Sequence, residues 1–232
     1  MKPALLLSDL HLPPEPSPLR QDFLAFLHGP ARGADTLYIL GDLFEYWIGD
    51  AEGREAYPAE WEALAALTRS GVRVRYQHGN RDFMVGPRFF AETGVELLPD
   101  PAVVELAGTP TLLSHGDLFC TGDVAYQRWR RFSRRPLAQW IYRRLPRAVR
   151  QAVAGNLRGR SQYKPASIMD VAAEAVSEAF RRHGVRRIVH GHTHRPALHA
   201  LGEGRERWVL ADWRPDRREY LRVDDTIERV TL

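Results

Sequence analysis

The sequence contains little cysteine, little lysine and no long apolar run. Its single cysteine, Cys120, excludes a disulfide within the chain and is typical of a reducing compartment. No stretch approaches the roughly 18 consecutive apolar residues that a membrane-spanning helix requires. The few apolar residues before Asp9 are also too short for a signal peptide. We therefore expect a cytoplasmic protein that is soluble or attached to a membrane only at its surface.

Positive charge is supplied almost entirely by arginine and is unevenly distributed. Lys2 and Lys164 are the two lysines among 33 basic residues, and the formal net charge is +4. The segment 118–165 contains eleven arginines, one lysine and one acidic residue, Asp123, so it carries +11 and leaves −7 for the rest. A mildly acidic body with one strongly basic segment predicts an anionic partner, which could be a nucleotide, a nucleic acid or a membrane surface.

The remaining composition is that of one large globular domain over residues 1–232. Apolar residues make up 44% of the chain, and no repeat or low-complexity tract divides it. Strands are expected at 35–40, 72–77, 103–106, 111–114 and 187–190, and helices at 58–70, 89–92 and 168–183. The alternating tail from 197 to 232 predicts hairpins. This order predicts a layered α/β fold, in which binding sites form at the carboxyl ends of strands.

Polar residues follow five of the predicted strands. The first apolar run, Leu5 to Leu7, is followed by Asp9 and His11, which point to the same side of an extended chain. The other four junctions are Gly41-Asp42, Gly79-Asn80-Arg81-Asp82, His115-Gly116-Asp117 and Gly191-His192-Thr193-His194. Each could be an ordinary turn or a core histidine if it stood alone. Because five occur in order, we expect them to converge on one edge of a sheet.

The side chains at these junctions form a mixed set of imidazole, carboxylate and amide donors. Such a set suits Mn²⁺, Fe²⁺ or Zn²⁺ better than Mg²⁺, which prefers oxygen ligands and water. It also exceeds the needs of one ion and suggests two metals that share a bridging carboxylate. Two such ions lower the pKa of a shared water, so Ser114 and Cys120 need no role as nucleophiles.

At these residues the chain resembles the calcineurin-like metallophosphoesterases, whose five-block pattern it matches without a missing ligand. The resemblance implies a first metal bound by Asp9, His11, Asp42 and His194, and a second bound by Asp42, Asn80, His115 and His192, with Asp42 as the bridge. It also implies an α/β (α+β) four-layer sandwich of two mixed β-sheets flanked by helices. The expected catalytic residues are Asp42, Asn80, Arg81 and His194.

One position departs from the broader family pattern. The family usually carries a histidine after the asparagine, where it can protonate the leaving group, whereas this chain has Arg81. Arginine stays protonated in proteins and is a poor general acid, but it suits bidentate contact with a phosphate. We therefore expect a leaving group that needs little protonation, such as a phosphate in a pyrophosphate bond.

The residues around the blocks narrow the resemblance. The stretches 38–45, 47–50, 79–83, 115–117, 168–171 and 190–196 resemble the UDP-2,3-diacylglucosamine pyrophosphatases of lipid A synthesis. This resemblance implies manganese-dependent attack of a metal-bridging hydroxide, which yields UMP and 2,3-diacylglucosamine 1-phosphate. The implied substrate contacts are Asn80, Arg81, Asp123, Tyr126, Ser161, Lys164 and His194. The stretch 157–163 is shorter than the family pattern, which bears on Ser161 and on acyl-chain selectivity.

The basic segment 118–165 is expected, by the same resemblance, to form a helical cap over the metals. Its helix-compatible stretches, 124–135, 137–145 and 147–157, are separated by Pro136 and Pro146. Apolar side chains between its arginines offer surface for acyl chains beside cations for phosphates and anionic lipid. The alternative is that these side chains only pack the cap helices together. We expect a monomer, peripheral on the cytoplasmic face of the inner membrane, with a nucleotide-linked lipid as substrate.

Three alternatives to this function stay open. A pyrophosphatase or phosphodiesterase of the same superfamily could act on another nucleotide-linked lipid or on a nucleotide. Nucleic-acid binding through the arginines is disfavoured, because apolar residues interrupt them and no recognised reading motif is present. A metal-free scaffold would be expected to have lost ligands, and this chain has lost none.

Overall fold

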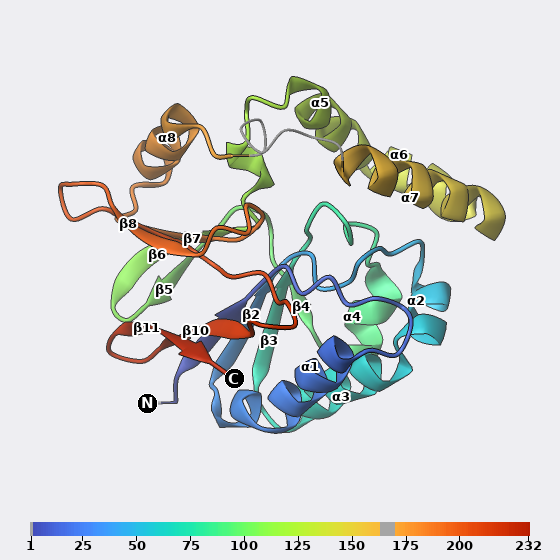
Figure 1. Cartoon of the computed structure of the whole chain (residues 1–232), viewed down its shortest axis with the longest axis horizontal. Helices are drawn as coiled ribbons and strands as arrows, with labels where there is room; N and C mark the ends of the chain where they lie inside the picture. The colour runs from blue at the N-terminus through green and yellow to red at the C-terminus, as the bar shows by residue number, and fades with distance from the viewer. Residues whose placement is uncertain (1, 163–169) are drawn as a thin grey trace.

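The structure is a computed structural model that describes residues 2–162 and 170–232, with side chains described outside 156–162. Its centre is formed by two mixed sheets (Figure 1). The first sheet has the order β11-β10-β1-β2-β3-β4. Its strands are β1 (Ala4–Leu7), β2 (Thr36–Leu40), β3 (Arg73–Gln77), β4 (Glu96–Leu97), β10 (Glu219–Val223) and β11 (Ile227–Thr231). Strands β1 to β4 are parallel, and the hairpin of β10 and β11 adds antiparallel to β1.

The second sheet has the order β5-β6-β7-β9-β8. Its strands are β5 (Ala102–Leu106), β6 (Thr109–Ser114), β7 (Arg187–His190), β8 (Ala197–Ala200) and β9 (Glu206–Val209). Strands β6, β7 and β9 are parallel, whereas β5 and β8 pair antiparallel at the two edges. The strands expected at 103–106 and 111–114 form a hairpin, β5 with β6. The hairpins predicted for the tail are confirmed, and the tail contributes one hairpin to each sheet.

Helices flank both sheets. They are α1 (Pro18–His28), α2 (Asp50–Ala56), α3 (Pro58–Arg69), α4 (Pro87–Thr93), α5 (Val124–Ser133), α6 (Pro136–Arg144), α7 (Arg147–Gln162) and α8 (Ala173–His183), with short 3₁₀ turns at Pro30–Gly33 and Asp117–Phe119. Four of the helices begin with proline, whose fixed φ suits the first helical turn. In Figure 1, α1 to α4 lie beside the first sheet, α8 lies against the second, and α5 to α7 lie together at the top of the view.

The alternation of strand side chains explains why a central strand such as β1 is apolar throughout. On β1, Leu5 and Leu7 pack with α1 and α3 in one cluster, whereas Leu6 belongs to the cluster between the sheets. On β6 and β7, Leu113 and Val189 join that same inner cluster, while their neighbours Leu112 and Ile188 pack against α8. A strand buried on both faces needs apolar residues at every position. The result is four layers, helices–sheet–sheet–helix, and the predicted four-layer sandwich is confirmed.

Two details of the prediction are wrong. The five polar junctions do not share one sheet edge, because β1, β2 and β3 belong to the first sheet whereas β6 and β7 belong to the second. Over the described part of 168–183, the helix begins only at Ala173. The backbone just before Ala173 is not helical. There the N–H of Val171 donates to the Asp170 carboxylate, and the N–H of Ala172 donates to the Phe119 carbonyl oxygen.

Candidate metal centre

The loops at the carboxyl ends of strands from both sheets meet at one place. Hydrogen bonds between these loops hold them together. The loop after β1 continues to pair with the loop after β2: the Asp9 N–H donates to Gly41 O at 3.1 Å and the His11 N–H to Asp42 O at 3.0 Å. The two sheets are joined across the gap, because the His192 N–H donates to Asp9 Oδ2 at 2.8 Å. The predicted ligand loops are therefore brought together from both sheets.

The backbone at these loops is strained in a way that marks the site. Among the described residues, seven non-glycine residues have a positive φ, and five of them are predicted ligands: Asp9 (56°), His11 (48°), Asp42 (51°), His192 (69°) and His194 (55°). The other two, Ala107 and Glu203, lie in hairpin turns. Left-handed backbone costs an L-residue of the order of 1–3 kcal/mol and concentrates at functional sites. The five predicted ligands thus adopt an unfavourable backbone conformation that the rest of the fold stabilises.

Glycine is required beside Asp42 for steric reasons. Gly41 has φ of +86°, and a Cβ added to it would lie 2.6 Å from Gly79 Cα. A Cβ on Gly79 would lie 2.0 Å from Asp42 Oδ1. The loops after β2 and β3 can therefore approach each other only as glycine-bearing turns, which explains the Gly-Asp and Gly-Asn pairs of the sequence.

The first group of donor atoms comprises Asp9, His11 and His194. His11 Nε2 lies 3.2 Å from His194 Nε2, and His194 Nε2 lies 3.3 Å from Asp9 Oδ1. Asp42 Oδ2 is 3.9 Å from His11 Nε2. Asp9 Oδ1 is buried and has no hydrogen-bond partner among the described residues. A buried carboxylate oxygen facing two imidazole nitrogens is costly unless a cation lies between them.

The second group of donor atoms is built around His115. Its Nε2 lies 2.9 Å from Asn80 Oδ1 and 3.8 Å from Asp42 Oδ2. The ring of His192 lies 5.0 Å from that of His115, centroid to centroid. One ligand atom each from Asp9, Asp42 and His115 lies within 4.8 Å of the others, so the two groups are contiguous. Asp42 lies between them, where a bridging carboxylate is expected.

The outer ring nitrogens support the same orientation. His115 Nδ1 lies 2.9 Å from the Leu40 carbonyl oxygen and donates its proton there, so loss of the Nε2 proton leaves a lone pair that faces the group. His194 Nδ1 lies 3.6 Å from Asp212 Oδ2. Metal-binding histidines commonly turn their second nitrogen toward a carbonyl or a carboxylate in this way. The donor set therefore fits divalent transition-metal ions.

Burial and mutual charge perturb the acidities of these groups. Burial raises the pKa of Asp42 to about 7, with Asp82 and Asp9 adding to the rise against the opposing effect of His115. Burial acts against a charged His115 ring, yet the Asp42 and Asp9 carboxylates raise its pKa to about 9. Burial lowers the pKa of His11 to about 3. Without a metal, the Asp42–His115 pair therefore retains a proton at neutral pH that a bound cation would displace.

Asp82 has a supporting role that sequence reasoning missed. Its buried carboxylate accepts the N–H of Gly79 and the N–H of Leu43, both at 2.8 Å, and also the hydroxyl of Tyr76. It therefore connects the loop that carries Asn80 to the loop that carries Asp42. Its position at the end of the Gly-Asn-Arg-Asp turn was the available signal, but two of these three partners, Leu43 and Tyr76, lie in another loop and in β3.

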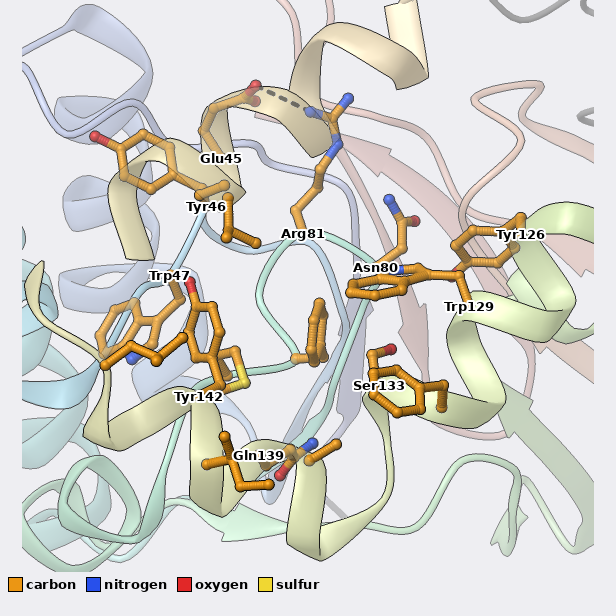
Figure 2. A pocket seen from close by; sticks show the side chains of 18 of the residues that line it. Glu45, Tyr46, Trp47, Asn80, Arg81, Tyr126, Trp129, Ser133, Gln139 and Tyr142 are labelled. Atoms are coloured by element: carbon orange, nitrogen blue, oxygen red, sulfur yellow. Dashed lines mark hydrogen bonds and ion pairs between the residues drawn. The ribbon is translucent and has the colours of Figure 1, made fainter. Parts of the chain in front are cut away.

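A cavity of about 570 Å³ adjoins the second group of donors (Figure 2). Asn80 and Arg81 line it, and most of the remaining wall is aromatic or aliphatic and comes from α5, α6 and α7. Of the predicted substrate contacts, Asn80, Arg81 and Tyr126 line it. Asp123 instead caps α5, since its Oδ1 accepts the Tyr126 N–H at 3.0 Å. The Ser161 side chain and Lys164 lie outside the described residues.

Helix α5 is attached to the metal loops by buried ion pairs. Arg130 Nε donates to Asp117 Oδ2 and Arg130 Nη2 to Asp100 Oδ2, both at 2.8 Å. Arg134 Nη2 donates to the Gly79 carbonyl oxygen at 2.7 Å. The ring of Tyr126 lies nearly parallel to that of His192, 6.5 Å away. Part of the basic segment thus packs directly on the loops that carry the second group of donors.

Comparison with known proteins agrees with this geometry. Residues 2–196 match the family described as calcineurin-like phosphoesterase. The chain is 49% identical to a UDP-2,3-diacylglucosamine hydrolase of Pseudomonas paraeruginosa over 90% of both chains. It is 45% identical to that of Aeromonas hydrophila, also over 90% of both. A solved archaeal phosphodiesterase superposes with a TM-score of 0.51 at 10% identity over 99% of both chains, which supports the fold alone. The chain therefore belongs to the calcineurin-like phosphoesterase family.

Proposed function

We propose that this protein hydrolyses the pyrophosphate bond of UDP-2,3-diacylglucosamine to give UMP and 2,3-diacylglucosamine 1-phosphate. The observation that carries the proposal is the junction of two unlike surfaces at Asn80. Its Oδ1 lies 2.9 Å from His115 Nε2 in the donor group, and the same residue lines the apolar cavity. A substrate that fits this junction has phosphates on one side and acyl chains on the other. The relatives at 45–49% identity bear the name of this activity.

The donor groups are proposed to hold two ions, with Mn²⁺ as the metal. Asp9, His11, Asp42 and His194 would hold the first, and Asp42, Asn80, His115 and His192 the second. Two bound dications lower the pKa of a water molecule and neutralise charge on phosphoryl oxygens. The buried carboxylates of Asp9 and Asp42 would supply negative charge that balances part of the positive charge of the ions.

Arg81 is proposed to bind the pyrophosphate beside these groups. Its backbone N–H donates to Asp42 Oδ1 at 2.8 Å, so Arg81 lies directly next to the carboxylate that is proposed to bridge the ions. The guanidinium stays protonated and offers paired N–H donors to phosphate oxygens. Its charge stabilises the phosphate that leaves, and this leaving group needs no proton from the enzyme. His194 and Tyr126 are proposed as further contacts, together with Asp123, Ser161 and Lys164.

The cavity under α5 to α7 is proposed to bind the acyl chains. Its wall includes Phe83, Met84, Trp129 and Ile141, which present apolar surface that is favourably removed from water. Residues 118–165 act in this proposal as a cap that closes over the metal centre. The acyl chains remain beside the cap while the pyrophosphate reaches the donor groups.

The outer face of the cap is proposed to bind the cytoplasmic surface of the inner membrane as a monomer. Leu137 and Trp140 on α6 are 68% and 52% exposed, and Arg144 stacks on Trp140 at 3.6 Å. Exposed apolar side chains beside arginines suit an anionic lipid surface. No helix in the described ranges 2–162 and 170–232 has the length and hydropathy to cross a bilayer.

A substrate panel with manganese tests the proposal. We expect release of UMP from UDP-2,3-diacylglucosamine, and little turnover of simple nucleotide pyrophosphates or p-nitrophenyl phosphodiesters. A metal-loaded preparation that cleaved the other substrates and left the UDP-lipid intact would instead support a superfamily enzyme with another nucleotide-linked substrate.

A further inference from the structure

Glu45 lies in the loop after β2, three residues beyond Asp42, and is held against the loop of His11. Its backbone N–H donates to the Leu12 carbonyl oxygen at 3.0 Å, and the adjacent Phe44 forms a parallel bridge with Leu12. Its side chain is 17% exposed and lines the cavity (Figure 2). The position of this carboxylate therefore follows from the backbone pairing that also positions His11.

The two oxygens of the Glu45 carboxylate face two different groups of the site. Oε2 lies 3.6 Å from His11 Nδ1, and Oε1 lies 3.3 Å from Arg81 Nη1. Figure 2 shows the contact with Arg81 as a dashed line at the edge of the cavity. His11 Nδ1 is buried and has no hydrogen-bond partner among the described residues. Within residues 2–162 and 170–232, the Glu45 carboxylate is the acidic group that pairs with this outer nitrogen.

The same arrangement recurs at two other histidines of the centre. His115 Nδ1 faces the Leu40 carbonyl oxygen and His194 Nδ1 faces the Asp212 carboxylate, while the Nε2 atom of each faces the donor group. His11 Nε2 likewise faces the first group, 3.2 Å from His194 Nε2. An oxygen at Nδ1 selects the ring form in which Nε2 carries the lone pair.

We propose that Glu45 is a positioning residue that orients His11 for metal binding and Arg81 for phosphate binding. One carboxylate oxygen holds the His11 ring with its Nε2 lone pair toward the first metal site. The other holds the Arg81 guanidinium at the edge of the cavity. The His11 half stands on the donor geometry alone, whereas the Arg81 half rests on the proposed function.

Titration of the metal-free protein with Mn²⁺ tests the His11 half without any substrate. Removal of an outer carboxylate from a metal-binding histidine typically weakens metal affinity about 10- to 100-fold, and we expect that loss for Glu45→Ala. Glu45→Gln keeps the shape and an acceptor oxygen, so its loss should be smaller. Nitrogen NMR of the His11 ring should show the Nε2-protonated form gaining population in Glu45→Ala.

Glu62→Ala is the matched control, because Glu62 is an exposed glutamate paired with Arg69 on α3. Near-ultraviolet circular dichroism verifies that each variant is folded, and Glu45→Gln serves if the alanine variant is not. Equal Mn²⁺ affinity in the Glu45 variants and in Glu62→Ala would overturn the His11 half.

A double-mutant cycle at saturating Mn²⁺ tests the Arg81 half. If Glu45 acts through Arg81, Glu45→Ala should reduce kcat/KM in the wild-type background and have little further effect in Arg81→Ala. Additive losses would overturn this half. A wild-type enzyme inactive on the UDP-lipid would contradict the proposed function and leave the metal titration to decide the role of Glu45 at His11.

Discussion

Single residues in the loops that carry the predicted metal ligands are critical, because the backbone there is left-handed. Asp9, His11, Asp42, His192 and His194 all have positive φ, and the glycines beside them remove the clashes that side chains would cause. The sequence predicted which residue types gather, because Asp, His and Asn stood in order after apolar runs. It could not predict the supporting roles of Glu45 and Asp82, since those depend on partners in other loops.

Replacement of Gly79 by alanine should displace Asp42 and disable the site. The added Cβ would lie 2.0 Å from Asp42 Oδ1, so the carboxylate or the loop must move by more than an ångström. We expect kcat to fall by about 100-fold or more, as displacements of this size do in active sites, together with less Mn²⁺ bound per chain by elemental analysis. Gly33→Ala is the control, because a Cβ there meets nothing within 4 Å. Equal metal content in the two variants would contradict the steric argument.

Metal binding should release protons and strengthen as the pH rises. The pKa of Asp42 is raised to about 7 and that of His115 to about 9 in the metal-free protein, so both carry protons that a metal must displace. Affinity for Mn²⁺ should therefore increase from about pH 6 to about pH 9, where these protons are lost. Calorimetry in buffers of different ionisation enthalpy measures the protons released. A binding heat independent of the buffer at pH 7 would contradict the pKa shifts.

At the scale of elements, α5 is part of the proposed cap and also packs on the loops of the candidate metal centre. Arg130 reaches Asp117, Arg134 reaches Gly79, and Tyr126 lies against His192, so α5 contacts three of the ligand loops. The helical character of this segment was predictable from its prolines and apolar spacing. The packing of α5 on the loops was not predictable from the sequence, because its acidic partners Asp100 and Asp117 lie outside the helix.

Arg130→Met should release α5 from the metal loops. The change leaves the buried carboxylates of Asp100 and Asp117 without their shared cation, and loss of one partner of a buried pair costs about 3–5 kcal/mol. Hydrogen exchange of the α5 amides should accelerate, and Mn²⁺ affinity should fall with it. Arg131→Met, at the next and exposed position of the same helix, is the control. Unchanged exchange in Arg130→Met would show that α5 is held by other contacts.

At the scale of the whole molecule, the site is a joint between two sheets. The sequence alone suggested one sheet edge, because spacing along the chain does not say which strands are neighbours. The family resemblance implied two sheets, and the strand order places β1 to β3 in one and β6 and β7 in the other. Long-range pairing, such as that of β1 with β10, is decided by packing and is absent from local patterns.

Divalent metal should therefore raise the stability of the entire fold. Without it, strained backbone and the neighbouring carboxylates of Asp9 and Asp42 destabilise the loops that join the two sheets, and ligation offsets both. Binding to the native state alone at 100 times Kd contributes about 2.7 kcal/mol. Thermal unfolding should shift upward by several degrees with Mn²⁺ and return with a chelator. An identical Tm with and without metal would show that the joint does not depend on the ions.

The hydrogen bond from His192 to Asp9 spans 183 positions of the chain. During synthesis, Asp9 is released from the ribosome long before His192 and His194 exist, so a growing chain holds only part of its ligand set. Closing so long a separation comes late in folding, because local contacts form first. Full metal capture thus coincides with completion of the chain, and truncated products that end before β7 lack the means to assemble the centre.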